Sequence, residues 1–282
     1  INNAMLTVTG GDYSQLSLNS SVSGSGSVKV EGKVNVTFTG MNTYSGGTTI
    51  NKDTNLIAAI DNLPPMRTIQ NDGMFTINQT ERSATFGGRI FGKGTVILKG
   101  GKTVTLTGFN SYTGGTTISN DGSRLIGTTR TLPPGCPIIV GPTAKNASLI
   151  LLGERLGGSF TGNLSGLGSV TIQGGGFVTF IGNNTYTGGT TSNEGNKLTV
   201  TVGTSTSSLP QVGTVLDNGT LVFNQPTSGT VTFKAPIEGA GQLVVNGPGM
   251  VQFTNPITPS ITVIGGGIIG NTQTLLGNIE LD

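Results

Sequence analysis

The stretch that decides the fold is Gly-Met-Asn-Thr-Tyr-Ser-Gly-Gly-Thr-Thr-Ile, residues 40–50, because the chain repeats it twice. It returns as Gly-Phe-Asn-Ser-Tyr-Thr-Gly-Gly-Thr-Thr-Ile at 108–118 and as Gly-Asn-Asn-Thr-Tyr-Thr-Gly-Gly-Thr-Thr-Ser at 182–192. Tyr44, Tyr112 and Tyr186 are therefore 68 and 74 residues apart. A nearly fixed period predicts one structural unit stacked on itself, since a lone unit could not bury its apolar side.

The sequence around this block repeats as well. A Gly-x-Gly and an alternating apolar run begin at Gly24, Gly92, Gly166 and a fourth time at Gly239. Leu-Pro pairs follow the block at 63–64, 132–133 and 209–210. We therefore expect a single domain, 1–282, with four internal repeats at approximately 1–69, 70–140, 141–212 and 213–282.

The runs between the glycines are too short for helices and alternate with the period of a β-strand. In Val34-Asn35-Val36-Thr37-Phe38 every second side chain is apolar, so one set points inward and the other outward. Three such strands and their corners take roughly 20–25 residues, which predicts about three coils per repeat. The fold class is all-β: a right-handed parallel β-helix, or β-solenoid, of about twelve coils and about 60 Å, in which successive motifs lie directly above one another.

Each position of the block has a structural interpretation. The glycine pairs suit tight corners, and each tyrosine ring is expected to cover a corner of its own coil, with sugar stacking as the alternative. The fourth repeat departs from the pattern, because 255–260 read Asn-Pro-Ile-Thr-Pro-Ser, and its loop should differ in shape. The motif residues are Asn42, Tyr44, Gly46, Gly47, Thr48, Thr49, Asn110, Tyr112, Gly114, Gly115, Thr116, Thr117, Asn184, Tyr186, Gly188, Gly189, Thr190 and Thr191.

Composition argues against several classes of function. The net charge is only +2, with no basic cluster, so no nucleic-acid partner is expected. There is no His and one Cys, Cys136, which disfavours a zinc site and is expected to be a buried small hydrophobe. The Gly-Gly-x-Gly-x-Asp calcium motif is missing, and no helix or Walker lysine follows the Gly-x-Gly pairs, so we expect neither metal nor cofactor. No apolar run is long enough for a transmembrane helix.

The acidic residues are dispersed, which argues against an enzyme. Glycoside hydrolysis needs two carboxylates within about 5–10 Å of one another. Asp53, Asp121 and Glu194 take similar loop positions in three repeats, but stacking would set them about 14 Å apart along the axis. We therefore expect no catalytic residue.

Both ends of the chain look continuable. The sequence 281–282 followed by 1–6 would imitate 215–221, so a last coil could lead into another first coil. Two explanations remain open: a window from a longer chain, or copies that stack head to tail. The residues expected at such an end-to-end interface are Ile1, Leu6, Val8, Leu275, Ile279 and Leu281.

The block Asn-x-Tyr-[Ser/Thr]-Gly-Gly-Thr-Thr, at 42–49, 110–117 and 184–191, resembles the autotransporter-associated β-strand repeat of bacterial type V secretion passengers. With its flanking strands the resemblance covers most of the chain. It implies an extracellular or bacterial cell-surface β-helix used as an adhesin, a stalk or a matrix component. The start at Ile1, without a leader, is compatible with an export signal that was removed or lies outside this sequence.

The leading functional hypothesis is thus an extracellular structural β-solenoid that forms or extends a surface fibre or stalk by head-to-tail self-association. A monomeric passenger segment that binds surface or matrix glycans or a host receptor as an adhesin is the first alternative. A polysaccharide-active β-helix enzyme is the second.

Overall fold

The computed structural model describes residues 1–119, 121–202 and 207–282. These residues form two compact units, Ile1–Ile138 (unit 1) and Ile139–Asp282 (unit 2). Each unit is a β-solenoid of parallel strands, and the two contain about 13 turns in total, with about 1% helix. The described helical residues are a single 3-10 turn, η1 (Ile60–Asn62). The predicted all-β parallel solenoid is confirmed.

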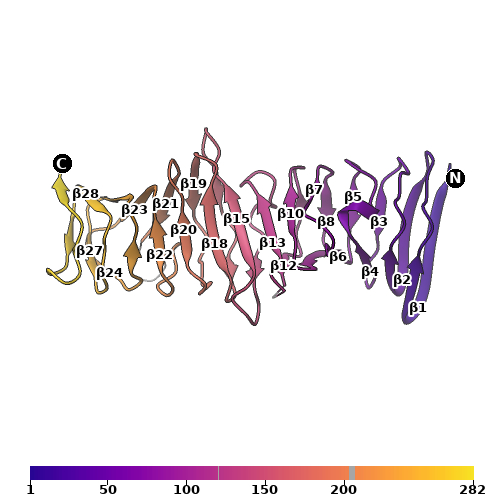
Figure 1. Cartoon of the computed structure of the whole chain (residues 1–282), viewed down its shortest axis with the longest axis horizontal. Helices are drawn as coiled ribbons and strands as arrows, with labels where there is room; N and C mark the ends of the chain where they lie inside the picture. The colour runs from indigo at the N-terminus through magenta and orange to yellow at the C-terminus, as the bar shows by residue number, and fades with distance from the viewer. Residues whose placement is uncertain (120, 203–206) are drawn as a thin grey trace. The chain divides into compact units, whose positions relative to one another are not determined.

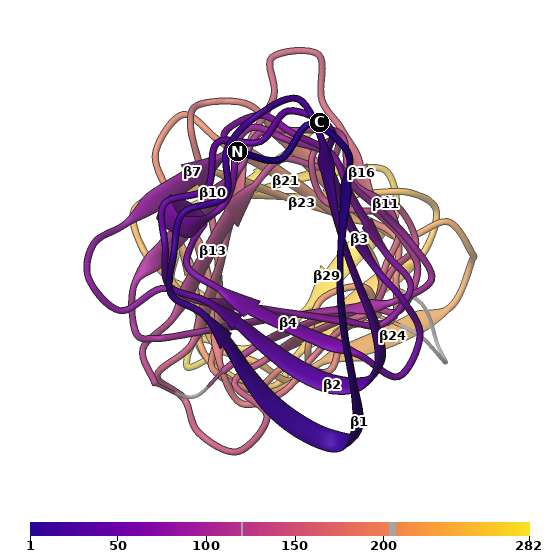
Figure 2. The same cartoon turned by 90° about the vertical axis from the view of Figure 1, so that its right-hand side faces the viewer.

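Each turn in unit 1 has three sides, which we name 1A, 1B and 1C, and Figure 2 shows its first coils end-on. The long bent strands β1 (Met5–Leu18) and β2 (Ser27–Phe38) cover 1A and 1B in the first two coils. Side 1A continues with β3 (Thr48–Ile50), β5 (Ile69–Asn71), β8 (Ile90–Gly92) and β11 (Ser111–Tyr112). Side 1B continues with β4 (Asn55–Ala58), β6 (Met74–Asn78), β9 (Thr95–Lys99) and β12 (Thr116–Ile118). Side 1C carries β7 (Ala84–Phe86), β10 (Thr103–Leu106) and β13 (Arg124–Gly127).

Unit 2 is built in the same way from sides 2A, 2B and 2C, whose strands can be followed in Figure 1. Side 2A carries β15 (Ser148–Leu152), β18 (Ser169–Gln173), β20 (Thr190–Ser192), β22 (Val215–Asp217) and β25 (Ile237–Glu238). Side 2B carries β16 (Ser159–Phe160), β19 (Phe177–Phe180), β21 (Lys197–Thr201), β23 (Thr220–Asn224), β26 (Gln242–Asn246), β28 (Ser260–Ile264) and β30 (Ile279–Leu281). Side 2C carries β14 (Ile138–Val140), β17 (Leu164–Ser165), β24 (Thr230–Phe233), β27 (Met250–Phe253) and β29 (Gly267–Ile269).

Alternation along each strand produces the core. The three residues of β3 are buried, half-buried and buried, as are those of β12 and β20, because successive side chains of a strand point to opposite faces. Because the strands pair in register, apolar side chains of successive coils stack on one another. One inward ladder of unit 1 runs through Val36, Leu56, Phe75 and Val96, all at most 1% exposed.

The number of sides per repeat differs from the expectation. From β3, which ends the first motif, the chain passes nine further strands and η1 before it completes β12, which ends the second. These ten sides are three turns and one additional side, so β3 lies on side 1A but β12 on side 1B. Unit 2 shows the same advance, since β20 lies on 2A and its counterpart in the fourth repeat, β28, lies on 2B. The prediction of about three coils per repeat is confirmed, since about 13 turns accommodate four repeats. The prediction that the motifs lie directly above one another was wrong, because within each unit the motif advances by one side from one repeat to the next.

Candidate functional site

The motif asparagines form hydrogen bonds to the backbone of the neighbouring coils. In the first motif Asn42 Oδ1 accepts a hydrogen bond of 2.8 Å from the Val22 backbone N–H, one coil earlier. Its Nδ2 donates to the Asn62 carbonyl of the next coil at 2.7 Å. One buried amide thus supplies hydrogen-bond partners to the backbone of both neighbouring coils, at Val22 and Asn62, which lie outside the strands. The same pair of contacts recurs at Asn110, with Ile90 and Thr131, and at Asn184, with Leu164 and Ser208.

The motif tyrosines are core residues. Tyr44, Tyr112 and Tyr186 are at most 1% exposed, and each phenol oxygen lies 2.6–2.7 Å from the hydroxyl of the threonine four residues later, Thr48, Thr116 or Thr190. Burial raises the pKa of Tyr44 to about 12, and it raises the pKa values of the other two phenols as well. No ring face is left on which a sugar could stack, so these rings have a packing role.

The two motif glycines serve different needs. A Cβ on Gly46 would lie 2.8 Å from the backbone of Gly26, the second glycine of the Gly-x-Gly one coil earlier. Gly47 has a φ of 86°, in the left-handed region that favours glycine. The corner prediction is therefore confirmed, with close backbone contact as an additional cause. The same two environments recur at Gly114 and Gly115 and at Gly188 and Gly189.

The paired threonines point in opposite directions. Thr48 is 4% exposed and faces inward, where it binds the Tyr44 phenol, whereas the neighbouring Thr49 is half-buried on the outer face. The second and third motifs place Thr116 and Thr190 inward and Thr117 and Thr191 outward in the same way. Each outward threonine thus contributes one hydroxyl to the surface of its side.

The fourth repeat replaces the tyrosine by an aliphatic residue. Ile257 is fully buried and forms parallel bridges to Ile237 and Leu275 in the adjoining coils. Asn255 is exposed, and its amide donates to the Lys234 carbonyl. The repeat then regains its pattern: the Asn271 N–H donates to the Thr274 hydroxyl at 2.8 Å, just as the Thr128 N–H donates to Thr131.

The acidic residues compared in the sequence do not take equivalent positions. Counted back from the buried leucines Leu56, Leu125 and Leu198, the residues that correspond to Asp53 are Gly122 and Gly195. All three have a positive φ, of 62°, 88° and 76°. Asp53, Asp121 and Glu194 thus lie in the corresponding loop of three repeats, but Asp53 is one position closer to its buried leucine than the other two are.

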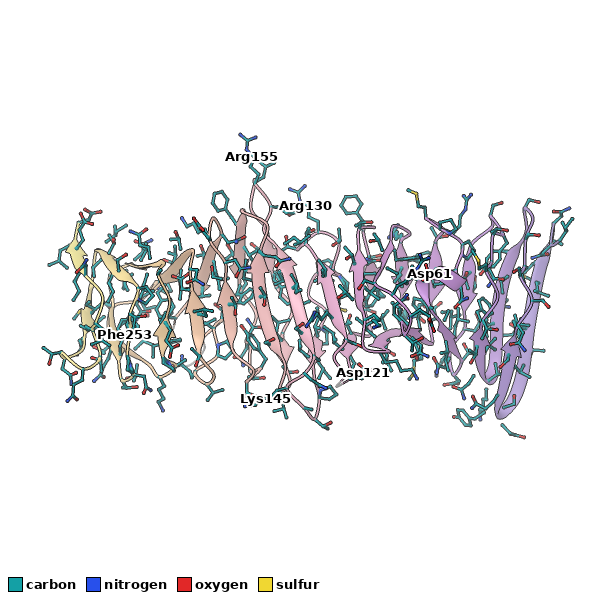
Figure 3. All side chains as sticks on the ribbon, in the orientation of Figure 1. Asp61, Asp121, Arg130, Lys145, Arg155 and Phe253 are labelled. Carbon is teal, nitrogen blue, oxygen red and sulfur yellow. The ribbon has the colours of Figure 1, made fainter. Side chains whose placement is uncertain are left out.

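Two carboxylates of unit 1, Asp121 and Asp61, are engaged by nearby hydrogen-bond or ion-pair partners. Asp121 Oδ1 accepts from the Ser123 hydroxyl, and its Oδ2 accepts from the Gly100 N–H, both at 2.6 Å. Asp61 lies elsewhere in the unit (Figure 3) and forms a salt bridge of 2.8 Å with Arg82, which holds the pKa of that carboxyl below its usual range. Neither arrangement sets two carboxylates against one bond.

Sequence reasoning missed a buried carboxyl group in unit 2. Asp217 is fully buried at the inward end of β22, where Oδ1 accepts from the Gly219 N–H at 3.1 Å, and among the described residues Oδ2 has no hydrogen-bond partner. It pairs in register with Ser192 of the preceding coil. Burial raises the pKa of Asp217 to about 6. The alternation of Val215, Leu216 and Asp217 along β22 could have revealed it, because the third position points inward.

Two open grooves lie at corners of the coils. One, of about 480 Å³, lies in unit 1 between sides 1A and 1B and includes Tyr13 and Asn55. The other, of about 450 Å³, lies in unit 2 between sides 2A and 2B and includes Phe177 and Glu194. Tyr13 is 63% exposed and lies outside the repeated block, so the repeat gave no signal for it.

Of the predicted end-to-end residues, all but Ile1 lie on ladders in the outermost described coils. Leu6 and Val8 pair in register with the buried Val28 and Val30, and both remain half-buried. At the other end Ile279 and Leu281 are 47% and 77% exposed. Leu275 is half-buried and paired with Ile257, whereas Ile1 is fully exposed.

Cys136 is buried, and its thiol lies 3.1 Å from the Tyr112 carbonyl. Within 1–119, 121–202 and 207–282 no group of three or more metal-binding side chains is found. Those same residues include no helix long and apolar enough to cross a membrane. Comparisons of the chain with models of protein families, with curated proteins and with solved structures found no match.

Proposed function

We propose that this chain is an extracellular structural β-solenoid that forms or extends a fibre or stalk at a bacterial surface by head-to-tail stacking of copies. The resemblance of 42–49, 110–117 and 184–191 to the autotransporter-associated β-strand repeat supports the location. The passenger of a type V secretion system is thus the class of protein in which we place it.

The observation that carries the proposal is the way in which one coil holds the next. Backbone ladders join each side of one coil to the same side of the next, and buried asparagines such as Asn42 join the segments that the ladders leave out. Stability in such a stack comes from contacts between nearest neighbours, so coils can be added without a new kind of interaction. That property suits a protein whose task is to extend.

The edges of the described coils offer the surfaces for such an addition. Ile279 and Leu281 of β30 continue the inward ladder of Ile261 and Val263, which are 1% and 4% exposed. The free edge of β1, next to the half-buried Leu6, offers backbone groups that can pair with a further strand. A contact between two different surfaces does not close on itself, so it produces open filaments.

Negative-stain microscopy and sedimentation velocity of the purified protein test this proposal. We expect filaments whose fraction grows with concentration, and fibre diffraction with a meridional spacing of about 4.8 Å. The variant Leu281→Lys should abolish them, because it places a charge on the inward ladder of the junction. Glu280→Lys on the same strand is the matched control, since Glu280 continues the outward ladder of Thr262.

Dispersed wild-type monomers at high concentration would refute head-to-tail stacking. Equal polymerisation of Leu281→Lys and Glu280→Lys would refute the assignment of β30 to the junction. Circular dichroism of both variants, compared with wild type, separates loss of assembly from loss of folding.

A further inference from the structure

The groove of unit 1 follows the stacking direction across five coils. Tyr13 lies in the first coil, Asn35 in the second, and Thr95 in the fifth, so the groove spans four coil steps of about 4.8 Å each. Its volume is about 480 Å³ and it is open along one side. The lining residues that decide its chemistry are Tyr13, Asn35, Lys52, Asp53, Asn55 and Asp72.

Two lining amides, Asn35 and Asn55, form a ladder in this groove, and the buried Thr76 hydroxyl of the next coil continues it beneath the surface. Asn55 Nδ2 donates to Asn35 Oδ1 at 3.1 Å, and Asn55 Oδ1 accepts from the Thr76 hydroxyl at 2.9 Å. Asn35 and Asn55 are in register and half-buried, so their side chains are fixed on one face but still reach solvent. Such fixed donors and acceptors suit a ligand with many hydroxyl groups.

Backbone conformation marks the same groove. The described residues contain four non-glycine residues with a positive φ, and two of them line the groove: Tyr13 and Asp53, at 56° and 62°. A third, Asp12, directly precedes Tyr13 and has a φ of 49°. Gly122 and Gly195 take the place of Asp53 in the next two repeats. A glycine would adopt this φ more easily, so the Asp53 carboxyl distinguishes this corner from those of the next two repeats.

The charges at the rim disfavour an anionic ligand. The charged residues that line the groove are one lysine, Lys52, and two carboxylates, Asp53 and Asp72. Hydrogen bonds from the Gln70 amide and the Lys93 N–H hold the pKa of the Asp72 carboxyl below its usual range, so Asp72 is ionised at neutral pH. The groove therefore carries a small net negative charge beside an exposed aromatic ring.

We propose that this groove binds a neutral linear oligosaccharide that lies along the stacking direction, with one sugar face against the Tyr13 ring and its hydroxyls on Asn35, Asn55 and Asp53. Successive sugars of an extended chain follow one another at nearly the spacing of the coils, so each coil meets about one sugar. The site does not depend on polymerisation, because every lining residue belongs to unit 1 of a single chain.

Isothermal titration of the full chain with cellotetraose, chitotetraose and mannotetraose, and with a heparin tetrasaccharide as the polyanion, tests the site. We expect at least one neutral tetrasaccharide to bind and heparin to give no heat. Tyr13→Ala should weaken binding about tenfold, as expected for the loss of one stacked ring. Phe109→Ala is the matched control, since Phe109 is 69% exposed and is not among the lining residues of the groove.

Asp53→Gly separates binding from stability. This variant should lose affinity while its thermal midpoint stays level or rises, because glycine tolerates the positive φ of that corner. No binding of any neutral tetrasaccharide, a preference for heparin, or unchanged affinity in Tyr13→Ala would each overturn the proposal. None of these outcomes bears on filament formation, which is measured without sugar.

Discussion

The buried carboxyl group of Asp217 should make unit 2 more stable in mild acid than at neutral pH. Its pKa is about 6 in the folded chain against 3.8 for the free side chain. The folded state therefore binds this proton more tightly than the unfolded state, and the associated stability is complete below about pH 4 and is lost as the pH rises through about 6. A difference of about two pKa units corresponds to about 3 kcal/mol.

The second repeat suggests the variant that removes this dependence. Asn71 ends β5 as Asp217 ends β22, and each is followed by an Asx-Gly corner. Asn71 Nδ2 donates to the Thr95 carbonyl at 2.8 Å, a bond that an ionised carboxylate cannot make. Asp217→Asn should therefore raise the stability at pH 8 by up to about 3 kcal/mol, roughly 10 °C in thermal midpoint, and change it little at pH 4.

Thermal unfolding followed by circular dichroism between pH 4 and pH 8 measures the effect. The difference between wild type and Asp217→Asn is the useful quantity, since carboxyls with lowered pKa values, such as Asp61 and Asp72, give the opposite slope in both proteins. Asn71→Asp is the reciprocal variant and should introduce the same acid dependence into unit 1. Parallel pH profiles of wild type and Asp217→Asn would refute the reasoning.

Three further substitutions test the roles of the motif residues, each by urea unfolding. Asn110→Ala should lower the free energy of unfolding by about 2–4 kcal/mol, because it leaves the Ile90 N–H and the Thr131 carbonyl without their partner. Asn255→Ala, at the exposed counterpart, should lower it by less than about 1 kcal/mol. Equal losses in the two variants would contradict the role of the buried asparagine in joining coils. Tyr112→Phe should cost about 1 kcal/mol through the lost bond to Thr116, and no change would mean that the ring alone matters. Gly188→Ala should cost about 1–3 kcal/mol or more, because its Cβ would lie 2.4 Å from the backbone of Gly168, while tolerance would show that the coils can separate.

The repeat was sufficient to predict the fold class, because alternating short strands between glycines have few other ways to bury their apolar faces. It also located the core tyrosines and the corner at Gly47, whose φ of 86° follows from the same turn chemistry. The number of sides per repeat could not be read in this way. Strand lengths and corner lengths vary, and only pairing such as that of Thr48 with Ile69 fixes how many sides make a turn.

The candidate sites were harder to predict than the fold. Asp53 was grouped with Asp121 because both are acidic, although φ angles show that its structural counterpart is Gly122. Tyr13 precedes the first motif and gave no periodic signal, and the importance of Asp217 depends on burial that composition does not reveal. A side chain that differs from its counterparts in the other repeats gives no periodic signal in the sequence. Its role becomes visible only when the structure shows which residues of the neighbouring coils surround it.

The ten-sided repeat has a consequence for how such a chain can lengthen. One further repeat within a unit would move each following strand to the next of the three sides, so a residue that fits one side must also fit the next. β3 on side 1A and β12 on side 1B both read Thr-Thr-Ile, so the same tripeptide fits two different sides. Three added repeats would return the following strands to their original sides. A surface such as the Tyr13 groove, repeated in this way, would then face the same direction each time.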